Sequence, residues 1–183
     1  MRYSWFHFFS EKQLPYDVIH LLNRYFYKMR RTIERNNGEI FNYMGDGLLA
    51  LFGVEDSIEA VEDSVSSAIE MLQAMDDMQP YLQNTYGQSL QIGIGIHYGE
   101  LVIGTIDDSH YDKKMVIGDA VNFASRVESA NKSECARLLI SQPMYDKLQH
   151  TIEIGHACKV EIKGKSGEHK LYEVKAISRA AIS

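Results

Sequence analysis

Two stretches of the chain repeat apolar residues at intervals of three and four, the spacing that places them on one face of a helix. The first begins at Pro15 and meets an Asn-Asn-Gly stop signal at residues 36–38. The second begins near Asp56 and runs toward Pro80. The pattern predicts two amphipathic helices, whose apolar positions are Val18, Leu22, Tyr25, Met29 and Ile33 in the first and Ile58, Val61, Val65, Ile69, Leu72 and Met75 in the second.

Short apolar runs between turn residues predict strands elsewhere. Residues 39–43 and 48–52 flank Gly45-Asp46-Gly47, whose Asp-Gly pair suits a tight hairpin turn. Asp119 is placed to cap a third helix that runs to about residue 130. Further strands are predicted at 90–97, 100–106, 115–117, 137–140, 152–157, 160–162 and 170–174, with a small helix at 143–148.

The predicted order of helix, hairpin, helix and strand is that of a ferredoxin-like βαββαβ core whose first strand is missing or very short. We therefore expect an α+β fold, in which helices cover one face of an antiparallel sheet. A length of 183 residues suits one ordinary domain. We expect residues 1–183 to form a single domain with a truncated or degenerate N-terminal strand.

Composition and charge narrow the classes of partner. The formal net charge is −6, and no basic patch suggests binding to nucleic acid or to an anionic membrane. No stretch has the length of a bilayer-spanning helix, and the N-terminal residues lack the pattern of a signal peptide. We expect a cytoplasmic domain. Cys135 and Cys158 lack the sequence neighbours of a zinc or redox motif, so we expect two reduced thiols.

The segment VIGDAVNFASRVE, residues 116–128, carries the most informative polar residues. On a helix that begins near Asp119, Asn122 and Arg126 are four residues apart and project from the same face. An amide and a guanidinium together suit a ribose and a phosphate that is losing its leaving group. On spacing alone, an asparagine and an arginine on a solvated helix face are the more ordinary interpretation.

Two turns carry charged residues. Asp46 at the hairpin tip can reach a phosphate-bound Mg²⁺, because hard cations prefer oxygen ligands, although local chemistry favours a residue that simply makes the turn. Lys163 and Lys165 occupy a later turn that by itself is typical of a solvated surface.

The glycines of residues 93–99 lack the spacing of a phosphate-binding loop, and we expect them to let a helix pack closely on the sheet.

Taken together, these segments resemble the class III adenylyl and guanylyl cyclases over almost the whole chain. The most specific match is residues 117–126, which follow the pattern Ile-Gly-Asp-x-Val-Asn-x-Ala-x-Arg. The resemblance implies a head-to-tail homodimer, or a heterodimer with another cyclase domain, that binds a nucleoside triphosphate between subunits. The implied products are a 3′,5′-cyclic nucleotide and pyrophosphate. The other matching stretches are residues 14–18, 22–26, 43–53, 94–100, 162–165 and 171–174.

The same resemblance implies roles for individual residues. In this family two aspartates of one chain hold two metal ions, Mg²⁺ or Mn²⁺, and the partner contributes base-reading and transition-state residues. Asp46 matches the second metal aspartate. Asn122 matches the residue that orients the ribose, and Arg126 matches the residue that stabilises the pentavalent phosphorus. Lys163 matches the lysine that meets the terminal phosphates.

Three positions depart from the family pattern. Arg2 stands where the first metal aspartate is expected, and because an arginine cannot coordinate a cation, we expect a weakened metal site. Asn42 and Met115 take the positions that read the base. Adenylyl cyclases have lysine and aspartate or threonine there, and guanylyl cyclases have glutamate and cysteine, so neither purine pattern is met. ATP is the first expectation, and a shift of the loop would let one of residues 112–114 replace Met115.

The sequence leaves three hypotheses open. The first is an active cyclase with a relaxed nucleotide preference, and the second is a cyclase-homology domain that dimerises, binds nucleotide and regulates a partner without turnover. The third, a ferredoxin-like module of another function, is disfavoured by the retained residues at four matching positions. Loss of the first aspartate favours the second hypothesis for a homodimer. A heterodimer would restore one site if its partner supplied both aspartates while this chain supplied Asn122 and Arg126.

Overall fold

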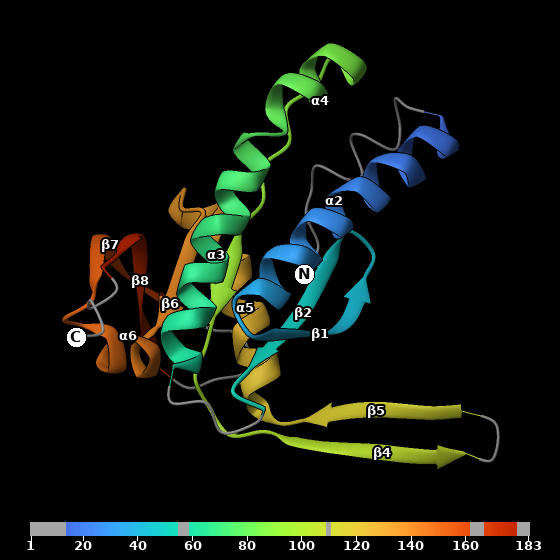
Figure 1. The fold of residues 1–183 in the computed structure, drawn as a ribbon. Helices are drawn as coiled ribbons and strands as arrows, with labels where there is room; N and C mark the ends of the chain where they lie inside the picture. Colours follow the sequence, from blue (N-terminus) through green and yellow to red (C-terminus); the bar gives the residue numbers. More distant parts are fainter. Residues whose placement is uncertain (1–13, 55–58, 109–110, 162–166, 179–183) are drawn as a thin grey trace, which may run out of the picture.

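The computed structural model describes residues 14–54, 59–108, 111–161 and 167–178 (Figure 1). Helices and strands are mixed along the chain, which confirms the predicted α+β class. The elements are α2 (Pro15–Arg35), β1 (Gly38–Met44), β2 (Gly47–Phe52), α3 (Ala60–Asp76), α4 (Gln79–Tyr86), β3 (Ile94–Ile96), β4 (Val102–Asp108), β5 (Tyr111–Ile117), α5 (Asp119–Glu134), β6 (Leu138–Ser141), α6 (Gln142–Leu148), β7 (Ile152–Glu161) and β8 (Glu168–Ile177).

The strands form one four-stranded sheet and two separate hairpins. In the sheet the order is β3-β6-β8-β7, with β3 parallel to β6 and the other neighbours antiparallel. β1 pairs antiparallel with β2, and β4 pairs antiparallel with β5. The sheet therefore differs from the expected all-antiparallel arrangement in one strand pair.

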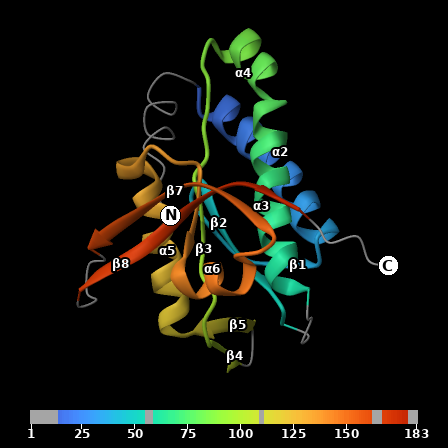
Figure 2. The same ribbon diagram turned by 90° about the vertical axis from the view of Figure 1, so that its left-hand side faces the viewer.

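Helices cover both faces of the sheet, whereas the sequence predicted helices on one face. The cause is β6, whose four residues are all buried, a run typical of a strand covered on both sides. Leu138 and Ile140 join the larger apolar cluster with α2, α3 and α6. Leu139, whose side chain points the other way, packs with Phe123 and Val127 of α5. Figure 2 shows α5 on one side of the strands and α3 on the other.

The first helix has the end signals that its sequence predicted. Pro15 occupies the first helical position, where its missing N–H costs nothing, and Asp17 in the first turn complements the helix dipole. The chain leaves the helix through Asn37, which has a φ of 57°. The buried face consists of Val18, Leu21, Tyr25, Met29, Thr32 and Ile33.

The second predicted helix corresponds to α3, and the helix α4 that follows it was not predicted. α3 ends at Asp76 and α4 begins at Gln79, one residue before Pro80. A proline lacks an N–H and its ring clashes with the carbonyl four residues earlier, which here belongs to Asp76. The sequence predicted a helix that runs toward Pro80, whereas in the structure Pro80 lies in the first turn of a further helix, a position that proline tolerates.

The hairpin β4–β5 is longer than predicted. The sequence predicted a polar connection at residues 107–114 and a brief strand after it. Pairing instead runs without interruption from Val102 opposite Ile117 to Asp108 opposite Tyr111. In Figure 1 this hairpin projects away from the rest of the domain. β7 is likewise one strand where two were predicted, with register irregularities between residues 153 and 157.

The helices of the described ranges differ in length and polarity. None of them combines the length with the apolar character needed to cross a bilayer.

Candidate functional site

Asp46 lies in the turn between β1 and β2. The strands close with Met44 opposite Gly47, so Gly45 and Asp46 form a two-residue turn. Gly45 has a φ of 65°, a conformation that glycine adopts without steric cost. The predicted hairpin turn is confirmed. Asp46 is only 5 % exposed, which is unusual for an aspartate at a turn, since such residues are mostly exposed.

The buried phenol of Tyr25 lies near acidic groups of both the hairpin tip and α5. Burial raises the pKa of Tyr25 far above its ordinary value, and the nearby carboxylates of Asp46 and Glu128 raise it further. Glu128 belongs to α5 and is 5 % exposed. Two buried carboxylates from different elements thus lie near one phenol. This grouping could not be predicted from the sequence, because Tyr25 has the spacing of an ordinary apolar position of the first helix.

α5 begins one residue earlier than an Asp119 cap would require. Gly118 is the N-cap residue, it makes no side-chain cap bond, and Asp119 is the first helical residue. The prediction that Asp119 caps the helix is therefore wrong. A carboxylate in the first turn still interacts favourably with the helix dipole.

Two contacts fix α5 on β3. A Cβ atom at Gly95 would lie 2.2 Å from the backbone nitrogen of Glu128 and 2.6 Å from its Cα, so only glycine fits there. Asn131 is buried, and its Nδ2 donates a hydrogen bond to the carbonyl oxygen of Ile94 at 3.0 Å. The prediction that the glycines of residues 93–99 allow a helix to pack closely is confirmed.

The predicted transition-state residues lie on this fixed helix. Asn122 is exposed and Arg126 is partly exposed, and both flank the side that Phe123 and Val127 bury in the core. They are one helical turn apart, as their spacing predicted. The arrangement presents an amide and a guanidinium to a ligand beside α5.

The predicted base-reading residues lie on different hairpins. Asn42 is exposed on β1, next to a register shift, and is paired with Leu49. Met115 is partly buried on β5, opposite Gly104. Asn42 and Met115 thus belong to separate hairpins, of which β1–β2 packs on α2 and α3 and β4–β5 projects outward. Residues 112–114 belong to a strand rather than to a loop.

Two predicted site residues cannot be placed. Lys163 and Arg2 lie outside the described residues.

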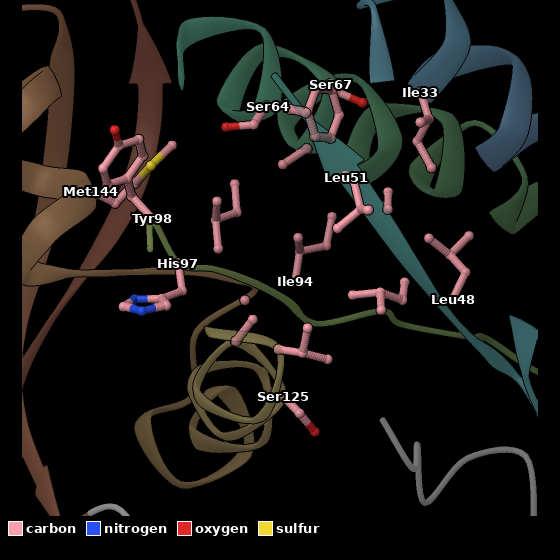
Figure 3. A pocket seen from close by; sticks show the side chains of 18 of the residues that line it. Ile33, Leu48, Leu51, Ser64, Ser67, Ile94, His97, Tyr98, Ser125 and Met144 are labelled. Carbon is pink, nitrogen blue, oxygen red and sulfur yellow. The ribbon is translucent and has the colours of Figure 1, made fainter. Parts of the chain in front are cut away.

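A cavity of about 1020 Å³ lies between β2 and β3, with α3 and α5 on its two sides (Figure 3). Its described walls are mostly apolar, with Leu48, Leu51 and Ile94 among them, and Lys147 is the one lysine or arginine among the described residues that line it. Among the described strands, β2 pairs only with β1 and β3 only with β6. In a complete ferredoxin-like sheet one more strand lies at this place, and the residues expected for it fall outside the described ranges.

Asp46 can contribute to a magnesium or manganese site. Mg²⁺ in proteins is commonly held by one or two carboxylates together with substrate phosphates and water. The buried Asp46 carboxylate, in the turn of a rigid hairpin, fits the role of one such ligand. The described residues place no second aspartate in a metal-binding group with it.

Known proteins are similar to this chain in sequence and in fold. The family model of the adenylate and guanylate cyclase catalytic domain matches residues 4–176. An adenylate cyclase of Anabaena cylindrica is 33 % identical over 174 residues, which are 91 % of this chain and 34 % of that protein. The chain thus spans about a third of the length of that curated relative.

Solved structures of cyclases have the same fold as this chain. The guanylyl cyclase Cya2 has a TM-score of 0.87 at 28 % identity, covering 98 % of this chain and 90 % of that one. The adenylyl cyclase CyaB from P. aeruginosa has a TM-score of 0.85 at 26 % identity, covering 95 % of this chain and 90 % of that one. The chain belongs to the adenylate and guanylate cyclase catalytic domain family.

Proposed function

We propose that residues 1–183 act as one catalytic domain in a nucleotidyl cyclase dimer, which converts a nucleoside triphosphate into a 3′,5′-cyclic nucleotide and pyrophosphate. The observation that carries the proposal is the setting of α5. The Gly95 contact and the Asn131 hydrogen bond hold this helix rigidly on β3. Asn122 and Arg126 remain accessible on it, one turn apart. Fixed polar groups of this kind lower a barrier by positioning and by charge stabilisation.

In the proposed reaction the ribose 3′-oxygen forms a bond to the α-phosphorus, the bond to the β-phosphate oxygen breaks, and the 3′-hydroxyl proton passes to solvent. Asn122 hydrogen-bonds the ribose and so orients the attacking oxygen. The Arg126 guanidinium donates to the oxygens of the pentavalent phosphorus, where negative charge accumulates. Lys163 contacts the terminal phosphates, which leave as pyrophosphate.

Asp46 is the proposed ligand of Mg²⁺ or Mn²⁺ in this site. When bound, the ion neutralises charge on the phosphates and so assists the displacement. Arg2 at the other metal position leaves Asp46 as the one aspartate of the usual pair, and the affinity for metal is therefore expected to be reduced.

Asn42 and Met115 are the proposed base contacts. The amide of Asn42 can both donate and accept a hydrogen bond, whereas Met115 can only pack against the base. This pair suits a relaxed preference among nucleotides, with ATP as the expected substrate. Because nucleoside triphosphates are cytoplasmic metabolites, the proposal also places the domain in the cytoplasm.

The exposed apolar face of the β4–β5 hairpin supports a dimer. Val102 is 67 % exposed and Ile117 is 61 % exposed, and they are directly paired, so both side chains lie on the same face of the hairpin. Exposed apolar groups that gather on a projecting element mark interaction surfaces. We propose that a second cyclase domain covers this face, in a homodimer or a heterodimer. Met115, two residues from Ile117, would then lie beside the interface.

A second candidate function is a regulatory partner that binds nucleotide without turnover as a homodimer. The observation that favours it is Arg2 at the position of the first metal aspartate. In a heterodimer with a domain that has both aspartates, this chain would contribute Asn122 and Arg126 to one complete site.

The test is incubation of the purified 183-residue protein with Mn²⁺ and each of ATP, GTP, CTP and UTP, followed by mass spectrometry of the products. We expect a cyclic product from ATP that Arg126→Ala abolishes. A parallel reaction adds a cyclase domain that has both metal aspartates but alanine at the position matching Arg126. Product in the mixture alone would support the second candidate, and no product in either reaction would refute both.

A further inference from the structure

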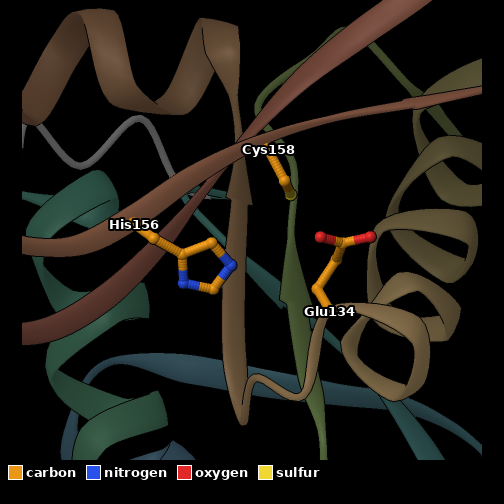
Figure 4. Close-up of side chains that lie close together, drawn as sticks. All are labelled: Glu134, His156 and Cys158. Carbon is orange, nitrogen blue, oxygen red and sulfur yellow. The ribbon is translucent and has the colours of Figure 1, made fainter.

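Three side chains with metal-binding chemistry meet at the far end of α5. Glu134 is the last residue of α5, and His156 and Cys158 are two residues apart in β7, so they project from the same face of that strand. A carboxylate oxygen, an imidazole nitrogen and the thiol sulfur all lie within 4.8 Å of one another (Figure 4). About 12 residues of helix, or roughly 18 Å, separate Glu134 from Asn122, so this cluster is distinct from the proposed cyclase site.

The imidazole of His156 is held in the orientation that a metal ligand needs. Its Nδ1 lies 2.8 Å from Oε2 of Glu173, whose other oxygen accepts a hydrogen bond from Lys175. In Figure 4 the second ring nitrogen lies on the side of Cys158 and Glu134. A histidine that ligates a metal almost always donates its other N–H to a carboxylate or carbonyl, which fixes the tautomer. Glu173, 11 % exposed at its side chain, supplies that second-layer carboxylate.

The thiol of Cys158 already makes a polar contact with Glu134. Its side chain packs against the apolar cluster beneath α5. Burial and the hydrogen bond to Glu134 raise the pKa of the thiol to about 11. A cation that binds between the sulfur and the carboxylate would take the place of the shared proton, which passes to solvent.

The spacing of the three groups is close to that of a tetrahedral site. Zinc bonds of about 2.0 to 2.3 Å place an oxygen, a nitrogen and a sulfur ligand roughly 3.3 to 3.6 Å apart, so the observed separations exceed this by about 1.5 Å at most. Rotation about the side-chain bonds of Glu134 can close that difference. β7 is an edge strand of the sheet, and the His156 side chain is 41 % exposed, which leaves a path for an ion and room for a water ligand.

We propose that Glu134, His156 and Cys158 bind one divalent transition-metal ion, with Zn²⁺ as the species that a sulfur, nitrogen and oxygen ligand set suits best. Three protein ligands leave the fourth position for water. The ion would join the C-terminal end of α5 to the edge strand β7. It would thus fix the far end of the helix that carries Asn122 and Arg126.

The proposal is tested with the purified 183-residue protein after removal of metal by chelation. Zn²⁺ is titrated in competition with a chromogenic chelator, and Co²⁺ is titrated while its absorption spectrum is recorded. We expect one Zn²⁺ per chain and a thiolate-to-cobalt charge-transfer band. Cys158→Ser and His156→Gln should each weaken Zn²⁺ binding at least about tenfold, and Cys158→Ser should remove the band.

Two matched controls separate this site from other thiols and metals. Cys135→Ser replaces the exposed thiol next to Glu134, and it should leave both the stoichiometry and the band unchanged. Asp46→Asn should also leave Zn²⁺ binding unchanged. Circular dichroism establishes that each variant is folded, and His156→Gln, at a partly exposed side chain, keeps the test valid if Cys158→Ser misfolds. Absence of stoichiometric Zn²⁺ binding, or equal binding by the wild type and His156→Gln, would overturn the proposal.

Discussion

Replacing Gly95 with alanine tests how closely α5 must approach β3. The added Cβ would lie 2.2 Å from the backbone nitrogen of Glu128, more than 1 Å inside the 3.4 Å at which ordinary van der Waals contact begins. Because the clashing atoms are backbone atoms, no side-chain rotation can relieve the overlap. The helix must move away from the strand, and Asn122 and Arg126 must move with it.

The size of the effect follows from two opposing contributions. Overpacking of a tight contact costs about 1–3 kcal/mol, and the lower entropy of the unfolded chain returns about 0.4–1 kcal/mol when glycine becomes alanine. We expect the overpacking cost to lie near the top of its range, because the overlap involves three atoms of Glu128. The free energy of unfolding should then fall by about 2 kcal/mol. For a domain of this size the melting temperature would fall by roughly 4–8 °C.

The assay is thermal unfolding of Gly95→Ala and of Gly104→Ala as a matched control. A Cβ at Gly104 on β4 meets no atom within 4 Å, so this variant should melt within about 1–2 °C of the wild type. A displacement of about 1 Å at the reacting groups should also lower turnover by about 100-fold in Gly95→Ala. Equal melting temperatures for Gly95→Ala and the wild type would refute the reasoning about this contact.

Three further predictions concern single residues. Arg126→Ala should lower product formation by about 10²–10³-fold while urea unfolding changes by less than about 0.5 kcal/mol, and a large loss of stability would instead indicate a structural role. Asp46→Asn should weaken Mn²⁺-dependent binding of ATP at least about tenfold, as measured by calorimetry, and unchanged binding would remove Asp46 from the metal site. Arg137 binds both carboxylate oxygens of Asp76 at 2.8 and 3.0 Å and so joins β6 to α3. Arg137→Ala should lower the free energy of unfolding by about 1 kcal/mol. Arg30→Ala breaks only an exposed pair on α2 and should leave the melting temperature unchanged. Equal effects of the two substitutions would contradict this ranking.

Local signals predicted the parts of the fold that depend on local chemistry. The glycines and aspartate of residues 45–47 predicted the β1–β2 hairpin, whose two turn residues are Gly45 and Asp46 rather than the Asp-Gly pair, and Pro15 predicted the start of α2. The spacing of Asn122 and Arg126 placed both on one helix. Such features need only neighbouring residues, and for that reason the sequence was sufficient to predict them.

Features that depend on distant contacts escaped the sequence analysis. The helix α4 was not predicted, because Pro80, which lies in its first turn, was interpreted as the end of the preceding helix. The long β4–β5 hairpin arises from backbone pairing that polar residues do not oppose. Cys158 lacked a motif in the sequence, since its neighbour Glu134 is 24 positions away and approaches only when β7 packs beside the end of α5.

The position of Met115 in the fold also could not be read from the sequence. Its distance from Asn42 within one chain depends on how far the β4–β5 hairpin projects. The exposed pair Val102 and Ile117 on the same hairpin marks the surface on which we propose that a second domain docks.

The role of α5 in a cyclase site is measured as formation of cyclic nucleotide by the purified protein, alone and mixed with a cyclase domain that has both metal aspartates but alanine at the position matching Arg126. We expect a 3′,5′-cyclic product with Mn²⁺ and ATP, and its loss when this chain carries Arg126→Ala. No cyclic product from any of the four nucleotides, in either reaction, would contradict the claim that α5 of this domain serves a cyclase site.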